Sequence, residues 1–307
     1  MKIANDITEL IGNTPLVKLN TPSNLTGANI IAKCEFMNPT SSVKDRVGFN
    51  MIRRAKEAFL IDENTTIIEP TSGNTGVALA ATCAAQNLKL ILTMPESMSI
   101  ERRKLLKAFG AKLVLTPASE GMNGSIKKAN DLKNEIENSI VLQQFENPSN
   151  PEIHELTTAK EILKDTDSKI DVFVAAVGTG GTLSGTAKVL KQEIKNIKIF
   201  AVEPEDSAVL SGGCAAPHEI QGIGAGFIPK NLDTSIYHEV IKVSNQDAID
   251  TAKMLAQKEG LLVGISAGAN VYATMQLASR AEYKGKTLVT ILCDTGERYL
   301  STELFDE

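Results

Sequence analysis

The chain has 307 residues, of which 42% are hydrophobic and 22% are charged, so it is long enough to bury a substantial core in one large domain or two. Its net charge of -5 comes without a block of basic residues, which argues against binding to nucleic acid or to an anionic membrane. The N-terminal segment has no apolar stretch of signal-peptide length, and no run approaches the ~18 apolar residues of a spanning helix. We therefore expect a cytoplasmic protein that acts on a small molecule and does not bind a membrane.

The chain offers few metal ligands or redox groups, which are Cys34, Cys83, Cys214, Cys293, His154, His218 and His238. The cysteines are widely spaced and form no C-x-x-C pair, so we expect buried free thiols in a reducing compartment. No two histidines have the i, i+4 spacing that places two ligands on one helical face. The sequence therefore predicts no metal site.

Short β-branched runs that lead through a glycine turn into a helical pattern occur over residues 65–86 and again over 171–194. Further strands are predicted over 88–95, 111–117, 197–204 and 286–294, and helices over 101–110 and 245–260. Both of these helices end in a glycine suited to a C-cap. Strand, turn and helix in this order predict an α/β fold with largely parallel sheets.

No low-complexity linker divides the chain, so two domains would have to be interleaved. We expect a smaller domain over 40–145 and a larger one formed by 1–39 plus 146–307, each a mostly parallel twisted sheet flanked by helices.

The first turn with binding potential consists of Gly178, Thr179, Gly180, Gly181 and Thr182. Its glycines allow close approach to the backbone and its hydroxyls add donors at a helix N-terminus, which suits one phosphate group. A dinucleotide fingerprint is the alternative, with Glu203 near the position of its acidic partner, but Leu183 occupies the place of the last glycine. A turn that only allows close packing is the third interpretation.

A second turn consists of Thr71, Ser72, Gly73, Asn74 and Thr75. It holds more hydroxyl and amide donors than a helix cap requires, and convergent neutral donors suit a carboxylate. An elaborate N-cap is the alternative. A third turn, over 264–268, offers one polar candidate, Ser266, and its composition fits packing and function equally.

Lys44 lies in the segment NPTSSVKDRVG (38–48), between a polar loop and a helix. A lysine alone is ordinarily a solvated surface charge. Its surroundings, however, belong to a series of segments that resembles the cysteine synthase branch of the pyridoxal phosphate (PLP) dependent β-family, the fold type II or tryptophan synthase β-like enzymes. These segments are IGNTPLVKL (11–19), NPTSSVKDRVG (38–48), EPTSGNTG (69–76), QQFENPSNPEIHELTT (143–158), GTGGT (178–182), QGIGAGFIPKNLD (221–233), GISAGA (264–269) and GERYLST (296–302).

The resemblance covers the whole chain in order and implies a role for each candidate residue. Lys44 would be the Schiff-base lysine and proton shuttle. The turn 178–182 would hold the cofactor phosphate, Asn74 the 3' oxygen of the pyridine ring, and Ser266 would face the ring nitrogen. The substrate carboxylate would bind to Thr71, Ser72, Gly73, Thr75 and Gln144.

The implied reaction is a β-replacement that makes L-cysteine from O-acetyl-L-serine and sulfide and releases acetate. The loop with Gly222 and Gly224 would border the active site and leave room chiefly for sulfide and short thiols. The smaller domain would close over the substrate. Asp45 is given no catalytic role, and Cys293 and Asp294 are interpreted as structural.

Several alternatives share these motifs. Cystathionine β-synthase has the same lysine, asparagine and phosphate turn, and related enzymes desulfhydrate cysteine or form lanthionine. A nicotinamide-dependent dehydrogenase would leave Lys44 unexplained. The resemblance also implies a homodimer and, as a function of another class, binding of the C-terminal tail of a serine acetyltransferase.

Overall fold

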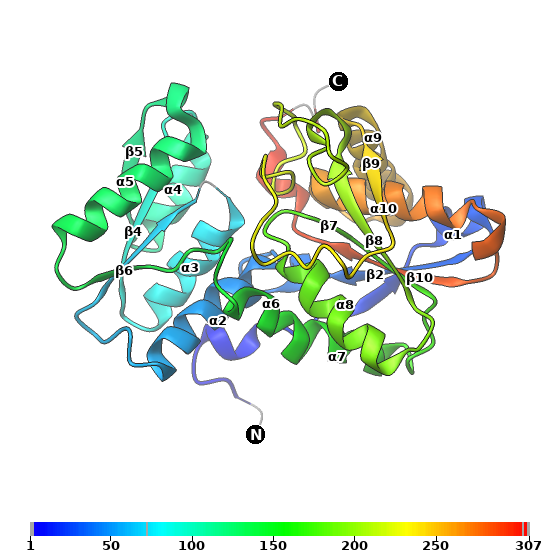
Figure 1. Cartoon of the computed structure of the whole chain (residues 1–307), viewed down its shortest axis with the longest axis horizontal. Coiled ribbons are helices and arrows are strands. Elements are labelled where there is room, and N and C mark those ends of the chain that lie inside the picture. The colour runs from blue at the N-terminus through cyan, green and yellow to red at the C-terminus, as the bar shows by residue number, and fades with distance from the viewer. Residues whose placement is uncertain (1–2, 72, 303, 306–307) are drawn as a thin grey trace. The chain divides into compact units, whose positions relative to one another are not determined.

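The computed structural model describes residues 3–71, 73–302 and 304–305. Ser72, one of the predicted carboxylate ligands, lies outside the described residues. The chain divides into two compact units: unit 1 consists of Met1–Ile11 and Lys44–Ser149, and unit 2 of Gly12–Val43 and Asn150–Glu307. Each unit contains a mostly parallel sheet with helices on both faces, which confirms the predicted fold class (Figure 1).

Unit 1 is built on a four-stranded parallel sheet in the order β5-β4-β3-β6. Its strands are β3 (Thr66–Pro70), β4 (Lys89–Pro95), β5 (Lys112–Thr116) and β6 (Ser139–Val141). Its helices are α2 (Lys44–Glu57), α3 (Asn74–Ala85), α4 (Ile100–Ala108) and α5 (Gly121–Glu135), with 3-10 turns at Ile7–Leu10 and Ala118–Glu120. Helix α5 buries Ala129 against Ile68 and Ile91 on one face of the sheet, while α3 brings Gly76 onto Leu92 on the other.

Unit 2 has a six-stranded sheet in the order β1-β2-β10-β7-β8-β9, in which only β1 runs antiparallel to its neighbour among the described strands. The strands are β1 (Leu16–Lys18), β2 (Asn29–Cys34), β7 (Val172–Ala176), β8 (Lys198–Pro204), β9 (Glu239–Val243) and β10 (Thr287–Leu292). The α-helices are α1 (Asn20–Thr26), α6 (Ser149–Ile153, whose first residue belongs to unit 1), α7 (Ala159–Asp165), α8 (Gly181–Glu193), α9 (Asn245–Met254) and α10 (Ile265–Ala278). Two π-helical turns, His154–Thr158 and Leu255–Glu259, extend α6 and α9, and 3-10 turns occur at Glu35–Met37, Glu205–Ser207, Ala281–Tyr283 and Gly296–Tyr299.

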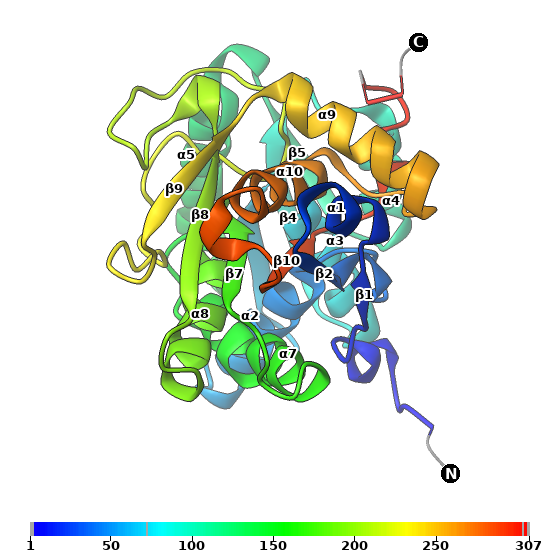
Figure 2. The ribbon, with the colours of Figure 1, turned by 90° about the vertical axis from the view of Figure 1, so that its right-hand side faces the viewer.

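Successive residues of β7 point to opposite faces of this sheet and so enter two different cores. Val172 and Val174 pack with residues of α9 and α10, whereas Phe173 and Ala175 pack with residues of α7 and α8. Figure 2 shows these two helix pairs on either side of the strands. Strands buried on both faces read as continuous apolar runs, which is why they were visible in the sequence.

The predicted elements form with small shifts at their ends. The strands predicted over 88–95 and 197–204 are one residue shorter at the start, and those predicted over 111–117 and 286–294 are two and three residues shorter in total, with losses at both ends. The glycines that end the two predicted helices, Gly110 and Gly260, have φ of 87° and 69°, in the left-handed region that favours glycine.

The expectation that all four thiols are buried is wrong for Cys214, which is exposed, and Cys293 is partly exposed. Neither residue belongs to a helix or strand, since Cys214 lies in a loop and Cys293 follows the end of β10. Burial raises the pKa of the Cys34 thiol to about 11 and that of Cys83 to about 12. Within the described part of the chain, no helix has the length and apolar character needed to cross a membrane.

Candidate active site

The segment that leads into Lys44 is hydrogen-bonded to other residues of unit 2. Asn38 donates from its side chain to Glu35 and accepts from the backbone N–H of Gly12. The N–H of Val43 donates to the carbonyl of Cys293 at 2.9 Å, at the end of β10. Lys44 itself is the first residue of α2 and is partly buried. Lys44 therefore follows directly after a loop that is hydrogen-bonded within unit 2.

Gly48 explains how α2 packs on α3 within unit 1. A Cβ at this position would lie 2.9 Å from the Cβ of Ala78 and 3.1 Å from its carbonyl carbon, so only glycine permits this approach. Lys44 and Asn74 are each the first residue of their helix, and each precedes the contact by four residues, about one turn. The close packing thus fixes the starting ends of the two helices that carry the predicted lysine and ring ligand.

The polar turn before α3 leaves the carboxyl end of β3 and has buried side chains. The N–H of Thr71 donates to the carbonyl of Thr93 on β4 at 3.1 Å, and the N–H of Gly73 lies 3.3 Å from the Thr71 hydroxyl. Thr75 is 3% exposed, and its hydroxyl donates to Gln144 Oε1 at 2.6 Å. The structure therefore brings together Thr75 and Gln144, which are 69 residues apart in the sequence.

Glu69 holds the backbone from which Gln144 projects. Its carboxylate is fully buried and accepts from the N–H groups of Gln143 and Gln144, each at 2.9 Å. Gln143 has φ of 63°, and successive N–H groups in such a conformation form a nest for an anion. Burial raises the pKa of the Glu69 carboxyl to about 7, although these backbone donors act to lower it.

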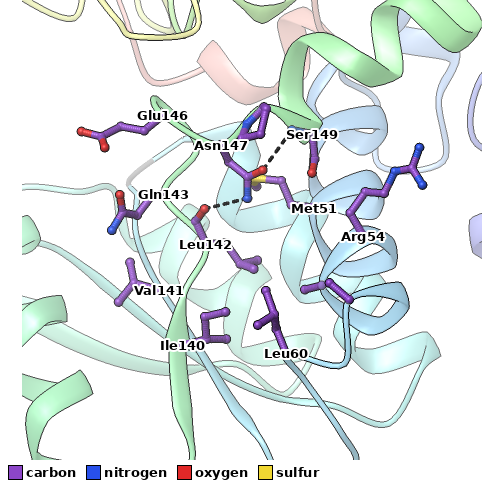
Figure 3. A pocket seen from close by; sticks show the side chains of 13 residues that line it. Met51, Arg54, Leu60, Ile140, Val141, Leu142, Gln143, Glu146, Asn147 and Ser149 are labelled. Carbon is purple, nitrogen blue, oxygen red and sulfur yellow. Dashed lines mark hydrogen bonds between the residues drawn. The ribbon is translucent and has the colours of Figure 1, made fainter.

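The loop after β6 is further braced by Asn147, as Figure 3 shows. Its side chain donates to the carbonyl of Leu142 at 2.8 Å and accepts from the N–H of Ser149 at 3.0 Å. A hollow of about 490 Å³ lies under this loop and is lined mainly by apolar side chains, among them Met51, Leu60 and Ile140. The predicted ligands among the described residues do not line it, so we do not assign it to the active site.

In unit 2, the glycine-rich turn joins β7 to α8, and each of its glycines meets a different segment. A Cβ on Gly178 would lie 2.3 Å from the carbonyl oxygen of Gly222, and one on Gly180 would lie 2.9 Å from the backbone of Leu232. Gly180 also has φ of 82°, which favours glycine. The N–H of Gly224 donates to the carbonyl of Val177 at 3.0 Å. The structure therefore places the predicted loop of Gly222 and Gly224 against the predicted anion turn.

Ser266 lies in the first turn of α10 and is 3% exposed. One turn further along the same helix, Asn270 accepts from the N–H of Ala176 at 2.7 Å and donates to the carbonyl of Ile291 at 2.8 Å. Asn270 thus ties the carboxyl ends of β7 and β10 to the start of α10. In open α/β sheets, ligands bind beyond these carboxyl ends.

The turn 178–182 fits one phosphate group. It combines a left-handed glycine, two threonine hydroxyls and the N-terminus of a 13-residue helix, a set of donors that suits an anion. Among the described residues, no group of three or more His, Cys, Asp or Glu side chains is arranged to hold a metal ion.

The sequence missed residues that act behind the predicted ligands. Glu69 stands inside the quoted segment EPTSGNTG, and its charge within a buried apolar strand was an available signal. Asn270 and Asn147 had no comparable signal, because their partners are backbone groups of distant segments.

Comparison with known proteins places this geometry in a family. Residues 7–294 match the model of the family described as "Pyridoxal-phosphate dependent enzyme". A curated "Cysteine synthase" of Staphylococcus aureus is 54% identical over 305 residues, which cover 99% of this chain and 98% of the relative. The chain thus belongs to the pyridoxal-phosphate dependent enzymes, which confirms the predicted cofactor and sets aside the nicotinamide alternative.

Solved structures similar over nearly the whole chain include cysteine synthases, a cystathionine beta-synthase and an O-ureido-L-serine synthase. The crystal structure of cysteine synthase (OASS) from Entamoeba histolytica has a TM-score of 0.96 and 44% identity, with 100% of this chain and 93% of that chain covered. The O-acetylserine dependent cystathionine beta-synthase from Helicobacter pylori has a TM-score of 0.92 and 40% identity, with 100% of both chains covered. The resemblance inferred from the sequence motifs, to cysteine synthases, is therefore confirmed.

Proposed function

We propose that this enzyme makes L-cysteine from O-acetyl-L-serine and sulfide by β-replacement and releases acetate. The observation that carries the proposal is the 54% identity to a cysteine synthase over nearly the whole of both chains. The two polar turns support it, because each offers donors suited to an anion and the reaction needs one site for a cofactor phosphate and one for a substrate carboxylate.

Bound pyridoxal phosphate supplies an aldehyde that condenses with amino groups and a ring that withdraws electrons from the substrate α-carbon. The phosphate would be held by the turn Gly178 to Thr182, at the N-terminus of α8. Asn74, at the start of α3, would donate to the 3' oxygen of the ring. Ser266 would face the ring nitrogen. Because a hydroxyl partner need not keep that nitrogen protonated, Ser266 would leave the ring a weaker electron acceptor and would favour early loss of the β-substituent.

Lys44 would first hold the cofactor through its amine and, once displaced by the substrate amine, remove the α-proton as general base. The same amine would return a proton to the α-carbon after sulfide has added at the β-carbon. The close contact of Gly48 with Ala78 supports this role, because it fixes the start of the helix that carries Lys44 within unit 1.

The substrate carboxylate would bind to Thr71, Ser72, Gly73, Thr75 and Gln144. The hydrogen bond from Thr75 to Gln144 Oε1 orients the Gln144 amide so that its NH₂ is the group able to donate. A small domain formed by residues 40–145 would close over the substrate and exclude water during the reaction.

The alternative function, that of a cystathionine β-synthase, differs from the proposed one in the sulfur nucleophile. The Helicobacter pylori structure, similar over the whole chain, is of an enzyme described as an O-acetylserine dependent cystathionine beta-synthase. The three left-handed glycines 222, 224 and 226 favour the smaller nucleophile, because they add no side chains to the loop beside the anion turn. Desulfhydration of cysteine and formation of lanthionine are the remaining alternatives.

We further propose a cytoplasmic homodimer, and binding of the C-terminal tail of a serine acetyltransferase as a second, regulatory function. The acidic net charge of -5 is consistent with a cytoplasmic location. Sedimentation of the pure protein and pull-down by a synthetic acetyltransferase tail test the two assemblies separately.

The experiment that tests the reaction is an absorbance titration of the purified yellow enzyme with O-acetylserine, followed by sulfide. We expect the cofactor band to shift on the first addition and to return on the second, with L-cysteine formed. A band that is unchanged by O-acetylserine but shifted by serine or cysteine would contradict the proposal and favour the alternatives.

A further inference from the structure

Asn150 and His154 lie directly behind the glycine-rich turn, on the segment where α6 continues into a π-helical turn. Both side chains are fully buried in unit 2. Asn150 Nδ2 donates to the Thr179 hydroxyl at 2.8 Å, and His154 Nε2 lies 3.2 Å from the Thr182 hydroxyl. Two residues that are four positions apart therefore contact the two hydroxyls of the turn.

The contact is close because α8 presents glycines to this segment. A Cβ on Gly181 would lie 1.9 Å from Asn150 Oδ1, and one on Gly185 would lie 2.9 Å from the Cβ of His154. Gly181 and Gly185 are one turn apart, so one glycine stripe of α8 receives both polar side chains. No bulkier residue could take either place without displacing Asn150 or His154.

The π-helical turn sets the direction of His154. The N–H of Ala159 donates to the carbonyl of His154, five residues earlier, and the other ring nitrogen, Nδ1, lies 2.9 Å from the Thr158 hydroxyl. Single π-turns inside α-helices are frequent at functional sites. The ring is thus held at both nitrogens, between Thr158 and Thr182.

A hydroxyl has one proton to donate and can accept through its lone pairs. Because the Asn150 amide donates to the Thr179 oxygen, the Thr179 proton must point to another acceptor. With the proton of His154 on Nε2, the same holds for Thr182, and the Thr158 hydroxyl then donates to Nδ1. The opposite tautomer would satisfy the same three groups but would turn the Thr182 proton onto Nε2, so the proposal commits to the form with the proton on Nε2.

We propose that Asn150 and His154 are positioning residues that aim the protons of Thr179 and Thr182 at the cofactor phosphate. This inference rests on the proposed assignment of the turn to that phosphate. Neither side chain needs to touch the cofactor. Their effect is transmitted by the hydroxyls, so it should disappear when the hydroxyl is removed.

The test is a double-mutant cycle on His154→Phe and Thr182→Val, read by the dissociation constant of pyridoxal phosphate from the apoenzyme and by the ³¹P shift of the bound phosphate. We expect each single variant to weaken binding about tenfold to a hundredfold, the range expected for loss of one hydrogen bond to a charged group. The double variant should be no weaker than Thr182→Val alone. Asn150→Ala with Thr179→Val forms a second, independent cycle should a His154 variant fail to fold.

Glu155→Gln is the matched control. It removes the exposed ion pair of Glu155 with Lys188, 2.7 Å long, which joins the same two segments away from the turn. We expect cofactor affinity within about twofold of the wild type, since exposed pairs contribute little.

The outcomes separate the two proposals. If Thr182→Val leaves both the affinity and the ³¹P shift unchanged, the phosphate assignment of the turn fails. If Thr182→Val weakens binding but His154→Phe does not, or if the two effects add fully, the phosphate assignment stands and the positioning role is overturned. If Glu155→Gln weakens binding as much as His154→Phe, general loosening of the helix pair explains both.

Discussion

The two turns at the starts of α3 and α8, to which we assign a substrate carboxylate and a cofactor phosphate, are built in different ways. The turn before α3 supplies side-chain donors and contains Gly73, which has open space around its missing Cβ. The turn before α8 supplies backbone N–H donors and has three glycines, each of which packs closely against another segment. The first arrangement suits a substrate that must enter and leave, and the second suits a cofactor that stays bound.

The groups behind the two turns differ as well. The α3 turn is supported through Gln144 by an ionisable carboxylate, Glu69. The α8 turn is supported by the amide of Asn150 and the imidazole of His154. A buried carboxylate is costly to keep charged, so the first support depends on pH in a way that an amide does not.

The largest expected effect comes from a residue that belongs to neither turn. Lys44→Ala should lower turnover by about 10³-fold or more, because it removes the proposed general base. Both turns remain intact in this variant, so phosphate-dependent binding of pyridoxal phosphate should persist. Steady-state rates and cofactor titration measure the two properties, and near wild-type turnover would refute the role of Lys44.

The pH dependence of stability distinguishes the carboxylate behind the α3 turn, Glu69, from the amide behind the α8 turn, Asn150. The pKa of Glu69 is raised from 4.5 to about 7 in the folded state, so the folded protein binds a proton more tightly than the unfolded chain does. The resulting stabilisation is complete below pH 4.5 and is lost as the pH rises through about 7. Relative to Glu69→Gln, the wild type should lose about 3 kcal/mol of unfolding free energy across this window.

Urea unfolding of both proteins between pH 5 and pH 8, followed by circular dichroism, measures this difference. Asn150→Ala should show no such pH-dependent difference from the wild type. Parallel pH profiles for the wild type and Glu69→Gln would contradict the raised pKa.

Alanine at corresponding glycines sharpens the contrast between the turns. Gly178→Ala places a Cβ 2.3 Å from the Gly222 carbonyl oxygen, so we expect cofactor affinity to fall by about 30-fold or more. Gly73→Ala meets no atom within 4 Å and should leave cofactor affinity within about twofold. Titration of the two apoenzymes with pyridoxal phosphate, followed by fluorescence, tests this. Equal losses of cofactor affinity would contradict the view that only the turn before α8 needs its glycines for close backbone packing.

Glu69→Gln should have the smallest effect on activity. It leaves the nest of Gln143 and Gln144 with one acceptor fewer, so Gln144 is less firmly placed. We expect the O-acetylserine concentration at half-saturation to rise by about tenfold, with cofactor affinity unchanged. A change in cofactor affinity of the same size would mean that Glu69 supports the whole unit rather than the carboxylate site.

Much of the fold was predictable because parallel strands buried on both faces carry unbroken apolar runs, as in β7 and β8. The candidate ligands were predictable because hydroxyls and glycines concentrate at strand-to-helix turns. The contacts behind them were not, since Glu69 and Gln144 are 75 residues apart and Asn150 and Thr179 are 29 apart. A single sequence carries no signal for such pairs, whose meeting depends on strand order and on a left-handed residue such as Gln143.

We propose that the two turns bind different groups. Thr75→Val and Thr179→Val, each measured for cofactor dissociation and for half-saturation by O-acetylserine, decide whether they do. We expect Thr75→Val to raise only the O-acetylserine concentration at half-saturation, and Thr179→Val to raise the cofactor dissociation constant. Variants that change the same constant, or that exchange these effects, would contradict it.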